Sequence, residues 1–203
     1  MRSIILTKTQ EMVIQLLLEN PDNQFSIRQI ARALKKSYTL TYHNIQDLCK
    51  RAILAKRDLP PAQIITLHEK VPTLILTRIE QTRMREFLEK NEWCRLYLND
   101  VLKASPHPFF VIIVFGSYAK GAQTTGSDLD LLTIVPHEED IDMFETATNQ
   151  FSKTKKNVIT ITADSFIEMI QNPKTFNVGN EAKKNHIILY NAETFYQFIE
   201  RAK

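Results

Sequence analysis

The sequence is poor in cysteine, glycine and tryptophan. Its 203 residues include 2 Cys, 4 Gly and 1 Trp. Cys49 and Cys94 are isolated and lack the spacing of metal ligands. This pattern predicts two reduced thiols and argues against a disulfide scaffold or a zinc site. No repeat and no low-complexity tract is present.

Long apolar runs are also missing. No stretch approaches the roughly 20 apolar residues that cross a bilayer. The beginning, MRSIILTKTQEMVIQLLLEN, is broken by charged and amide side chains, unlike the core of a signal peptide. We therefore expect a cytoplasmic protein with no membrane partner. The 5 histidines form no pair at helical metal-ligand spacing, so none is assigned a catalytic role.

The composition that remains is typical of a soluble globular protein, with 43% hydrophobic and 24% charged residues. The charge is unevenly divided. Residues 1–60 contain 10 Lys and Arg against 5 Asp and Glu, whereas residues 106–203 contain 9 against 12. The net charges are therefore +5 and −3. A basic excess in the first part favours a nucleic-acid partner for that part.

A Gly-Ser pair followed by two aspartates is the most informative motif. The apolar, β-branched run Val111–Phe115 predicts a buried strand, which ends at Gly116. Glycine allows the backbone to turn sharply and to approach a ligand, and the Ser117 hydroxyl beside free N–H groups suits a phosphate. The same residues are also compatible with a simple turn in a hairpin.

Two carboxylates follow ten residues later. A second strand is predicted from Asp128 to Val135. Because strand side chains alternate, Asp128 and Asp130 share one face. Two adjacent carboxylates repel each other unless a cation lies between them. Hard oxygen ligands favour Mg²⁺, which is usually completed by substrate phosphates and water.

These residues resemble the signature of the DNA polymerase β-like nucleotidyltransferase superfamily, and the short C-terminal part is most similar to its minimal members. The resemblance implies that Gly116 and Ser117 hold nucleotide phosphates and that Asp128 and Asp130 are catalytic ligands of Mg²⁺ or Mn²⁺. Lys120 and Ser127 are added as candidate nucleotide contacts. The implied reaction is attack of an acceptor hydroxyl on the α-phosphate of a nucleoside triphosphate such as ATP.

The family pattern has a third carboxylate on a later strand, and here the sequence departs from it. The next predicted strand, 157–162, begins with Asn157. An amide can ligate a metal but cannot accept the proton of a nucleophile as a carboxylate can. Asp164 is interpreted as the N-cap of a helix from Ser165 to Gln171. Two hypotheses follow: a slow or substrate-assisted transferase, or a nucleotide-binding regulator without chemistry.

The N-terminal part has the pattern of helix, helix, tight turn and helix. Helices are predicted over 7–18, over 27–34 with Ser26 as its cap, and over 39–51, followed by short extended segments at 53–55 and 64–67. This order resembles a winged helix-turn-helix domain, which implies binding of double-stranded DNA. The alternative is a winged helix that binds a protein partner.

On the DNA-binding hypothesis, the third helix enters the major groove and basic residues around it contact phosphates. The residues assigned to the groove are Thr39, Tyr42, His43, Gln46 and Lys50. The residues assigned to phosphates or to the wing are Arg28, Lys35, Lys36, Lys56 and Arg57.

The segment 73–103 contains no Pro or Gly and predicts a long helix, broken near Asn91. Its apolar face should pack on the transferase sheet or on a second copy of the chain, which would form a homodimer through this helix or through the winged helix. Helices are also predicted over 140–153 and 193–201, with a strand at 187–190.

We therefore expect an α+β protein with three parts. They are a winged helix-turn-helix domain at 1–70, a helical linker at 71–105, and a minimal nucleotidyltransferase domain at 106–203 with a small mixed sheet. Because minimal members of the superfamily include antitoxins that modify a partner toxin, a partner protein is a candidate acceptor.

Overall fold

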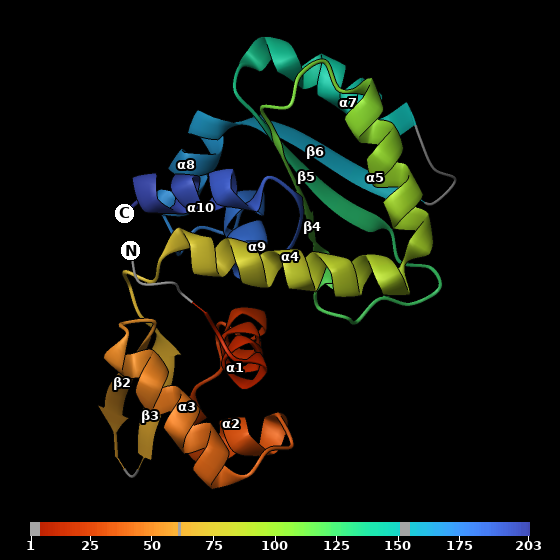
Figure 1. Ribbon diagram of the computed structural model, residues 1–203. Helices are drawn as coiled ribbons and strands as arrows, with labels where there is room; N and C mark the ends of the chain where they lie inside the picture. Colours follow the sequence, from red (N-terminus) through yellow and green to blue (C-terminus); the bar gives the residue numbers. More distant parts are fainter. Residues whose placement is uncertain (1–4, 61, 151–154) are drawn as a thin grey trace. The chain divides into compact units, whose positions relative to one another are not determined.

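The computed structural model describes residues 5–60, 62–150 and 155–203 (Figure 1). The chain divides after Ile79 into two compact units, each with its own core. Helices and strands occur in both units, which confirms the α+β class. In the described residues, no helix is long and apolar enough to span a membrane. The predicted helix end at Lys153 lies outside the described residues.

The first unit is a winged helix. Its elements are α1 (Lys8–Glu19), β1 (Phe25–Ser26), α2 (Ile27–Ala33), α3 (Tyr38–Lys50), β2 (Leu54–Leu59) and β3 (Ala62–Leu67). The three strands form an antiparallel sheet in the order β1-β3-β2. The predicted order of helices and hairpin is confirmed, whereas the short strand β1 was not predicted.

Local side-chain chemistry fixes the helix ends in this unit. Thr7 and Ser26 each form a capping box with the glutamine three residues later. Ser37 caps α3, so that helix begins at Tyr38, one residue before the predicted start. Lys35 turns the chain between α2 and α3 with a φ of 52°. The helices then bury one apolar face each, including Ile14, Ile30, Ile45 and Leu48.

The predicted long helix is two helices, α4 (Thr73–Lys90) and α5 (Glu92–Ala104). The break falls at Asn91, as expected, where φ is −129° and ψ is 65°. The Asn91 Nδ2 donates to the Phe87 carbonyl at 2.9 Å and so satisfies a carbonyl at the end of α4. Ile75 and Ile79 of α4 lie in the core of the first unit, and Phe87 lies in that of the second.

The second unit contains a four-stranded mixed sheet. Its further elements are β4 (Val111–Phe115), α6 (Gly116–Ala119), β5 (Leu129–Val135), the 3₁₀ helix η1 (Glu138–Asp140), α7 (Ile141–Gln150), β6 (Lys156–Thr162), α8 (Ala163–Gln171), α9 (Val178–Lys184), β7 (Ile187–Tyr190) and α10 (Ala192–Arg201). The strand order is β6-β5-β4-β7. β5 and β6 are parallel, and the other pairs are antiparallel.

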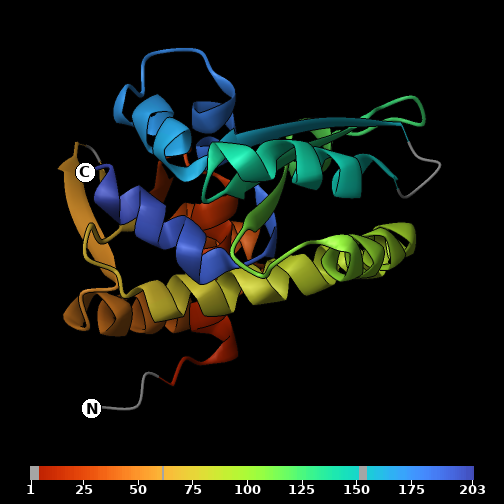
Figure 2. The same ribbon diagram turned by 90° about the horizontal axis from the view of Figure 1, so that it is seen from above.

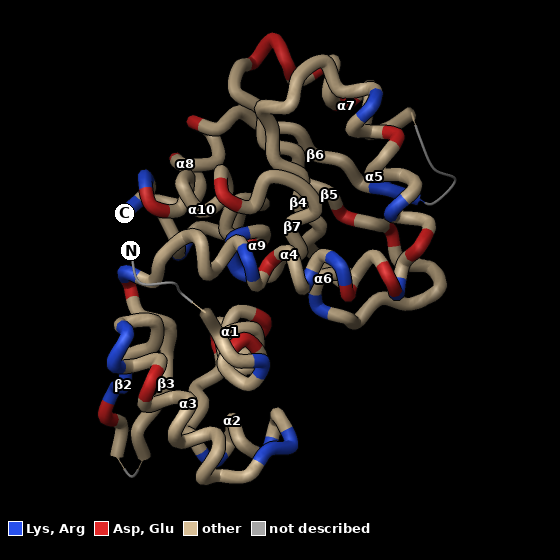
Figure 3. The backbone as a smooth tube through the Cα atoms, in the orientation of Figure 1, with Lys and Arg blue, Asp and Glu red and all other residues tan. Residues whose placement is uncertain are grey.

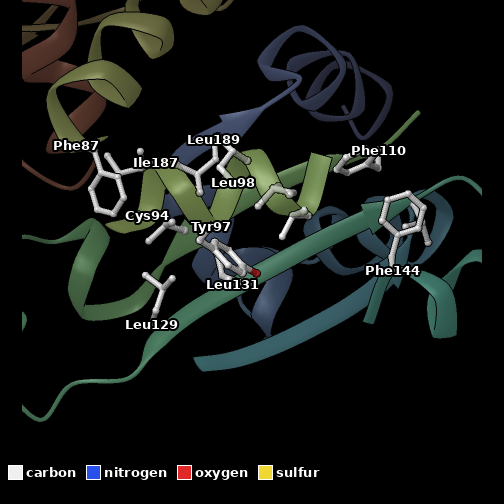
Figure 4. Packing of buried hydrophobic residues seen from close by; sticks show 14 residues of the cluster. Phe87, Cys94, Tyr97, Leu98, Phe110, Leu129, Leu131, Phe144, Ile187 and Leu189 are labelled. Atoms are coloured by element: carbon white, nitrogen blue, oxygen red, sulfur yellow. The ribbon is translucent and has the colours of Figure 1, made fainter. Parts of the chain in front are cut away.

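One face of this sheet is covered by α5 and the second half of α4, which run along one side of the strands in Figure 2 (yellow to light green). Cys94, Tyr97 and Leu98 of α5 pack with Leu129 and Leu131 of β5 (Figure 4). Burial raises the pKa of the Cys94 thiol to about 12. Cys94 and the half-buried Cys49 are free thiols, as predicted. The expected packing of the 73–103 segment on the sheet is confirmed, whereas its pairing with a second copy stays a prediction.

One local expectation about α8 is wrong. Asp164 does not cap this helix, because the helix begins two residues earlier at Ala163 with Thr162 as its N-cap. The Thr162 hydroxyl accepts from the Ser165 amide at 3.2 Å. Asp164 lies in the first turn, where its charge complements the helix dipole. Helices α6 and α9 were not predicted at all.

Candidate functional site

The Gly-Ser turn lies directly against the second aspartate. β4 ends at Phe115, which pairs with Asp130 on β5. Gly116 then adopts a φ of 67°, which glycine tolerates far better than other residues. A Cβ at this position would overlap the Asp130 carboxylate and would lie 3.1 Å from its Cγ. The absence of a side chain at Gly116 therefore allows the backbone and the carboxylate to approach closely.

Asn157 completes this edge of the sheet. The parallel register of β5 and β6 places Asn157 opposite Asp130. The Asn157 Nδ2 donates to the Asp130 Oδ1 at 3.3 Å. In the described part of the chain, no group of three or more His, Cys, Asp or Glu side chains could hold a metal ion. The residue beside Asp130, where the family pattern would have a third carboxylate, is the amide Asn157.

Asp128 lies one residue before β5, whose first residue is Leu129 and not Asp128 as predicted. Its Oδ2 is 3.5 Å from the Lys155 ammonium. Its Oδ1 is buried and has no hydrogen-bond partner. A buried carboxylate oxygen without a donor is unfavourable, and a cation would satisfy it. Asp128 and Asp130 therefore fit the requirement of Mg²⁺ for one or two carboxylates, with phosphate and water as remaining ligands.

The other candidate nucleotide residues lie in the segment between β4 and β5. Ser117 is half-buried in the single turn of α6. The Lys120 ammonium is 3.0 Å from Glu181 of α9. The Ser127 hydroxyl accepts from the Thr124 amide at 2.9 Å, so it closes the turn that precedes Asp128. Ser117 and Lys120 follow Gly116 closely in the sequence. Ser127 stabilises the turn between α6 and β5.

Gly116→Ala should weaken Mg²⁺-dependent nucleotide binding by about 10- to 100-fold, because the new methyl group displaces the Asp130 carboxylate. Trp93 is the single tryptophan, and its ring is 6.4 Å from that of Tyr118 on α6. Its fluorescence can therefore report binding in a titration with ATP and Mg²⁺.

Gly121→Ala is the matched control for this substitution. Gly121 has a similar φ of 64°, but nothing lies within 4 Å of a Cβ built there. Both substitutions carry the cost of a left-handed alanine, about 1–2 kcal/mol. Only Gly116→Ala also disturbs the carboxylate. Equal affinities of the two variants would contradict the assigned role of the Gly116 turn.

The second candidate surface is formed by α3 and its surroundings. Thr39, Tyr42, His43 and Lys50 are exposed, as expected for the outward side of α3. Gln46 was also expected on the outward side but is half-buried, and its Oε1 accepts from the Lys56 ammonium at 2.7 Å. The remaining basic candidates are also exposed, and Figure 3 marks Lys and Arg along α2 and β2. They are Arg28, Lys35, Lys36 and Arg57.

Two residues that contact the candidate nucleotide-binding residues were not assigned to the site from the sequence. Lys155 and Glu181 touch Asp128 and Lys120, respectively. Lys155 belongs to a lysine-rich segment of the sequence, which gave a weak signal for a phosphate-binding role. Glu181 could not be found because α9 has no clear apolar periodicity. Whether any of the candidate residues binds a ligand stays a prediction.

A mixed sheet with a Gly-Ser turn against Asp130, and with Asp128 two residues earlier in the chain, is the arrangement expected of a nucleotidyltransferase domain. In agreement, residues 97–189 match the family model described as nucleotidyltransferase domain. No curated protein matches the chain.

Several solved structures resemble part of the chain. ZitR from Lactococcus lactis, in a variant form, is 19% identical with a TM-score of 0.37, covering 45% of this chain and 62% of that one. AdcR from Streptococcus pyogenes is 22% identical with a TM-score of 0.38, covering 44% and 66%. MepR, a transcription regulator of a Staphylococcus aureus efflux pump, is 16% identical with a TM-score of 0.35, covering 48% and 78%. The order of helices and strands in the first unit itself identifies the winged helix.

Proposed function

We propose that the second unit binds a nucleoside triphosphate with Mg²⁺ or Mn²⁺ and transfers a nucleoside monophosphate to an acceptor hydroxyl. The observation that carries this proposal is the contact between the Gly116 turn and the Asp130 carboxylate, with Asp128 two residues away. The proximity of the Gly-Ser turn to the Asp130 carboxylate supports a shared site for a phosphate and a metal ion.

In this proposal, each candidate residue has a separate role. The Gly116 turn, Ser117 and Lys120 bind and orient phosphate oxygens, while Asp128 and Asp130 hold the metal ion. When bound, Mg²⁺ neutralises negative charge on phosphate oxygens. The acceptor oxygen forms a bond to the α-phosphorus as pyrophosphate leaves. Asn157 cannot take the acceptor proton, so that proton passes to the substrate or to water.

A second candidate function is supported by the Asn157 amide. It donates a hydrogen bond to Asp130, which occupies one of the oxygens needed for a metal. In this alternative, the domain binds a nucleotide without transferring it, and the protein is a nucleotide-responsive transcription regulator.

For the first unit, we propose binding of double-stranded DNA through α3. The net charge of +5 over residues 1–60 and the exposed basic side chains beside α3 support this role. The acceptor of the transferase is proposed to be a hydroxyl on a partner protein. We also propose a cytoplasmic location and a homodimer.

Mg²⁺ with ATP should raise the melting temperature of the wild-type protein, and Asp128→Asn combined with Asp130→Asn should abolish the increase. Ligand at 100 times its Kd stabilises a protein by about 2.7 kcal/mol, which corresponds to several degrees. Thermal unfolding with ATP and either Mg²⁺ or EDTA measures the effect. An undiminished increase in the double variant would place the nucleotide elsewhere.

The chain should also retard double-stranded DNA in a salt-dependent manner. Replacing Lys35, Lys36 and Lys50 by Ala should reduce the slope of log K against log salt by about 0.9 per lost phosphate contact. The control replaces Lys90, Lys103 and Lys174, which are exposed lysines of the second unit, so the total charge changes equally. The same flattening in both triple variants would show that charge alone, not the α3 surface, drives binding.

A further inference from the structure

Helix α3 lacks the side chain that most often recognises guanine. Its sequence, YTLTYHNIQDLCK, contains no arginine, and its single lysine lies in the last turn. Arginine and lysine recognise guanine through its O6 and N7 atoms in the major groove. The first three turns of α3 therefore offer no arginine or lysine for a G·C pair.

The two amide side chains on α3 are already engaged within the protein. The Asn44 Oδ1 accepts from the Thr7 hydroxyl at 3.0 Å, and its Nδ2 donates to the Leu40 carbonyl at 2.8 Å. The Gln46 Oε1 accepts from Lys56 at 2.7 Å. Recognition of adenine by Asn or Gln uses the oxygen and the nitrogen of one amide together. These contacts therefore oppose bidentate recognition of adenine by either residue.

The N-terminal half of α3 instead exposes an aromatic pair. Tyr38 and Tyr42 are 52% and 39% exposed, although large aromatic side chains are usually more buried. Their rings stack with centroids 6.1 Å apart and an interplanar angle of 29°. Leu40, between them in sequence, is 45% exposed. This end of the helix thus offers apolar surface at the point where recognition helices meet base edges.

Exposed positive charge in this region favours a DNA duplex as the ligand of the Tyr38–Tyr42 pair. Lys35 and Lys36 are exposed immediately before α3, and Arg28 is exposed on α2. An exposed apolar pair on α3, with exposed cations on α2 and just before α3, matches a duplex whose major groove presents apolar groups between two rows of phosphates. The C5-methyl group of thymine is the apolar group in that groove.

We infer that α3 selects thymine-rich duplex DNA by burying thymine methyl groups against Tyr38 and Tyr42. This inference rests on the proposed DNA-binding function and adds the sequence class that the helix prefers. Two stacked rings cover more than one base step, so neighbouring thymines are the preferred target.

The test compares duplexes of equal length that differ by the methyl group alone. Fluorescence anisotropy with the full chain measures binding to an A·T duplex and to the same duplex with deoxyuridine in place of thymidine. Each buried methyl should contribute about a fourfold difference in Kd, so two methyls should give more than tenfold. Tyr38→Ala with Tyr42→Ala should remove the difference. Leu74→Ala, which truncates a 71% exposed leucine on α4, should preserve it.

The outcomes separate this inference from the function on which it rests. Tight binding with equal affinity for the thymidine and deoxyuridine duplexes would overturn thymine selection and leave DNA binding intact. Stronger binding to a G·C duplex than to the A·T duplex would overturn it as well. If no duplex is bound at low salt, both proposals fail, and a protein partner becomes the occupant of the α3 surface.

Discussion

Asn157→Asp is expected to raise nucleotide transfer by about 10²- to 10⁴-fold over the wild-type protein. This range is the usual contribution of a positioned general base. The register of β5 and β6 already places residue 157 opposite Asp130, and the amide nitrogen is 3.3 Å from the Asp130 Oδ1. The substitution exchanges a hydrogen-bond donor for a carboxylate of nearly the same shape, so the backbone need not move.

The same substitution should have a second effect that does not depend on turnover. Without a metal ion, the new carboxylate faces Asp130 and repels it, so the melting temperature in EDTA should fall. Mg²⁺ should then stabilise this variant more than it stabilises the wild type. Asn157→Ala is the control, because it removes the amide without adding charge.

Transfer of labelled nucleotide to RNA, DNA or co-purified protein measures the activity. Brisk transfer by the wild type that Asn157→Asp leaves unchanged would show that residue 157 is not the third ligand position. If neither form transfers while both bind nucleotide, the regulator becomes the better description. Asp128→Asn in the Asn157→Asp background should abolish any gained activity.

The strand that carries Asp130 and the strand that carries Asn157 could be predicted, because runs of β-branched residues mark them in the sequence. Alternation assigned Asp128 and Asp130 to one face, although Asp128 lies one residue before β5. The resemblance to the nucleotidyltransferase superfamily, together with the strand pattern, placed Asn157 at the third position. The overlap between a Cβ at Gly116 and the Asp130 carboxylate could not be predicted, since it depends on the pairing of Phe115 with Asp130. Spacing along the sequence does not define distances across a sheet.

Other elements escaped prediction because tertiary contacts create them. Helix α9 has the sequence VGNEAKK, which has little apolar periodicity, yet it forms with Asn177 as its cap. A Cβ at Gly179 would lie 2.8 Å from the Met169 Cβ, so this glycine permits close packing of α9 on α8. Strand β1 has two residues and exists only because it pairs with β3. Such features require knowledge of the neighbouring element.

A buried ionic cluster in the second unit could likewise not be predicted from the sequence. Glu80 and Arg83 on α4 are 0% and 4% exposed, and the Arg83 Nη1 is 2.6 Å from the Glu80 Oε1. Tyr196 donates its hydroxyl to the same oxygen at 2.9 Å, and Arg83 also donates to the His186 carbonyl at 2.7 Å. The cluster joins α4 to α10 and to the residue before β7.

Glu80→Gln should therefore destabilise the second unit by about 3–5 kcal/mol, because it leaves the Arg83 guanidinium buried without its carboxylate. Tyr196→Phe removes a single neutral donor and should cost about 0.5–1.5 kcal/mol. Chemical denaturation measures both. Glu92→Gln is the matched control, since Glu92 and Arg95 have the same three-residue spacing at 2.7 Å but are exposed. Its effect should be small, because exposed pairs contribute little.

The pH dependence of unfolding gives an independent test of the same cluster. Burial alone raises the pKa of Glu80, but His186, Arg83 and the Tyr196 hydroxyl outweigh it and leave the pKa below its ordinary value of 4.5. A lowered folded-state pKa means that the stabilisation is fully present above pH 4.5 and is lost as the pH falls through the folded pKa. Glu80→Gln should flatten this acid limb, whereas Glu92→Gln should retain it. If both variants kept the wild-type acid limb and had equal stability at neutral pH, the ionised Glu80 carboxylate would not stabilise the second unit.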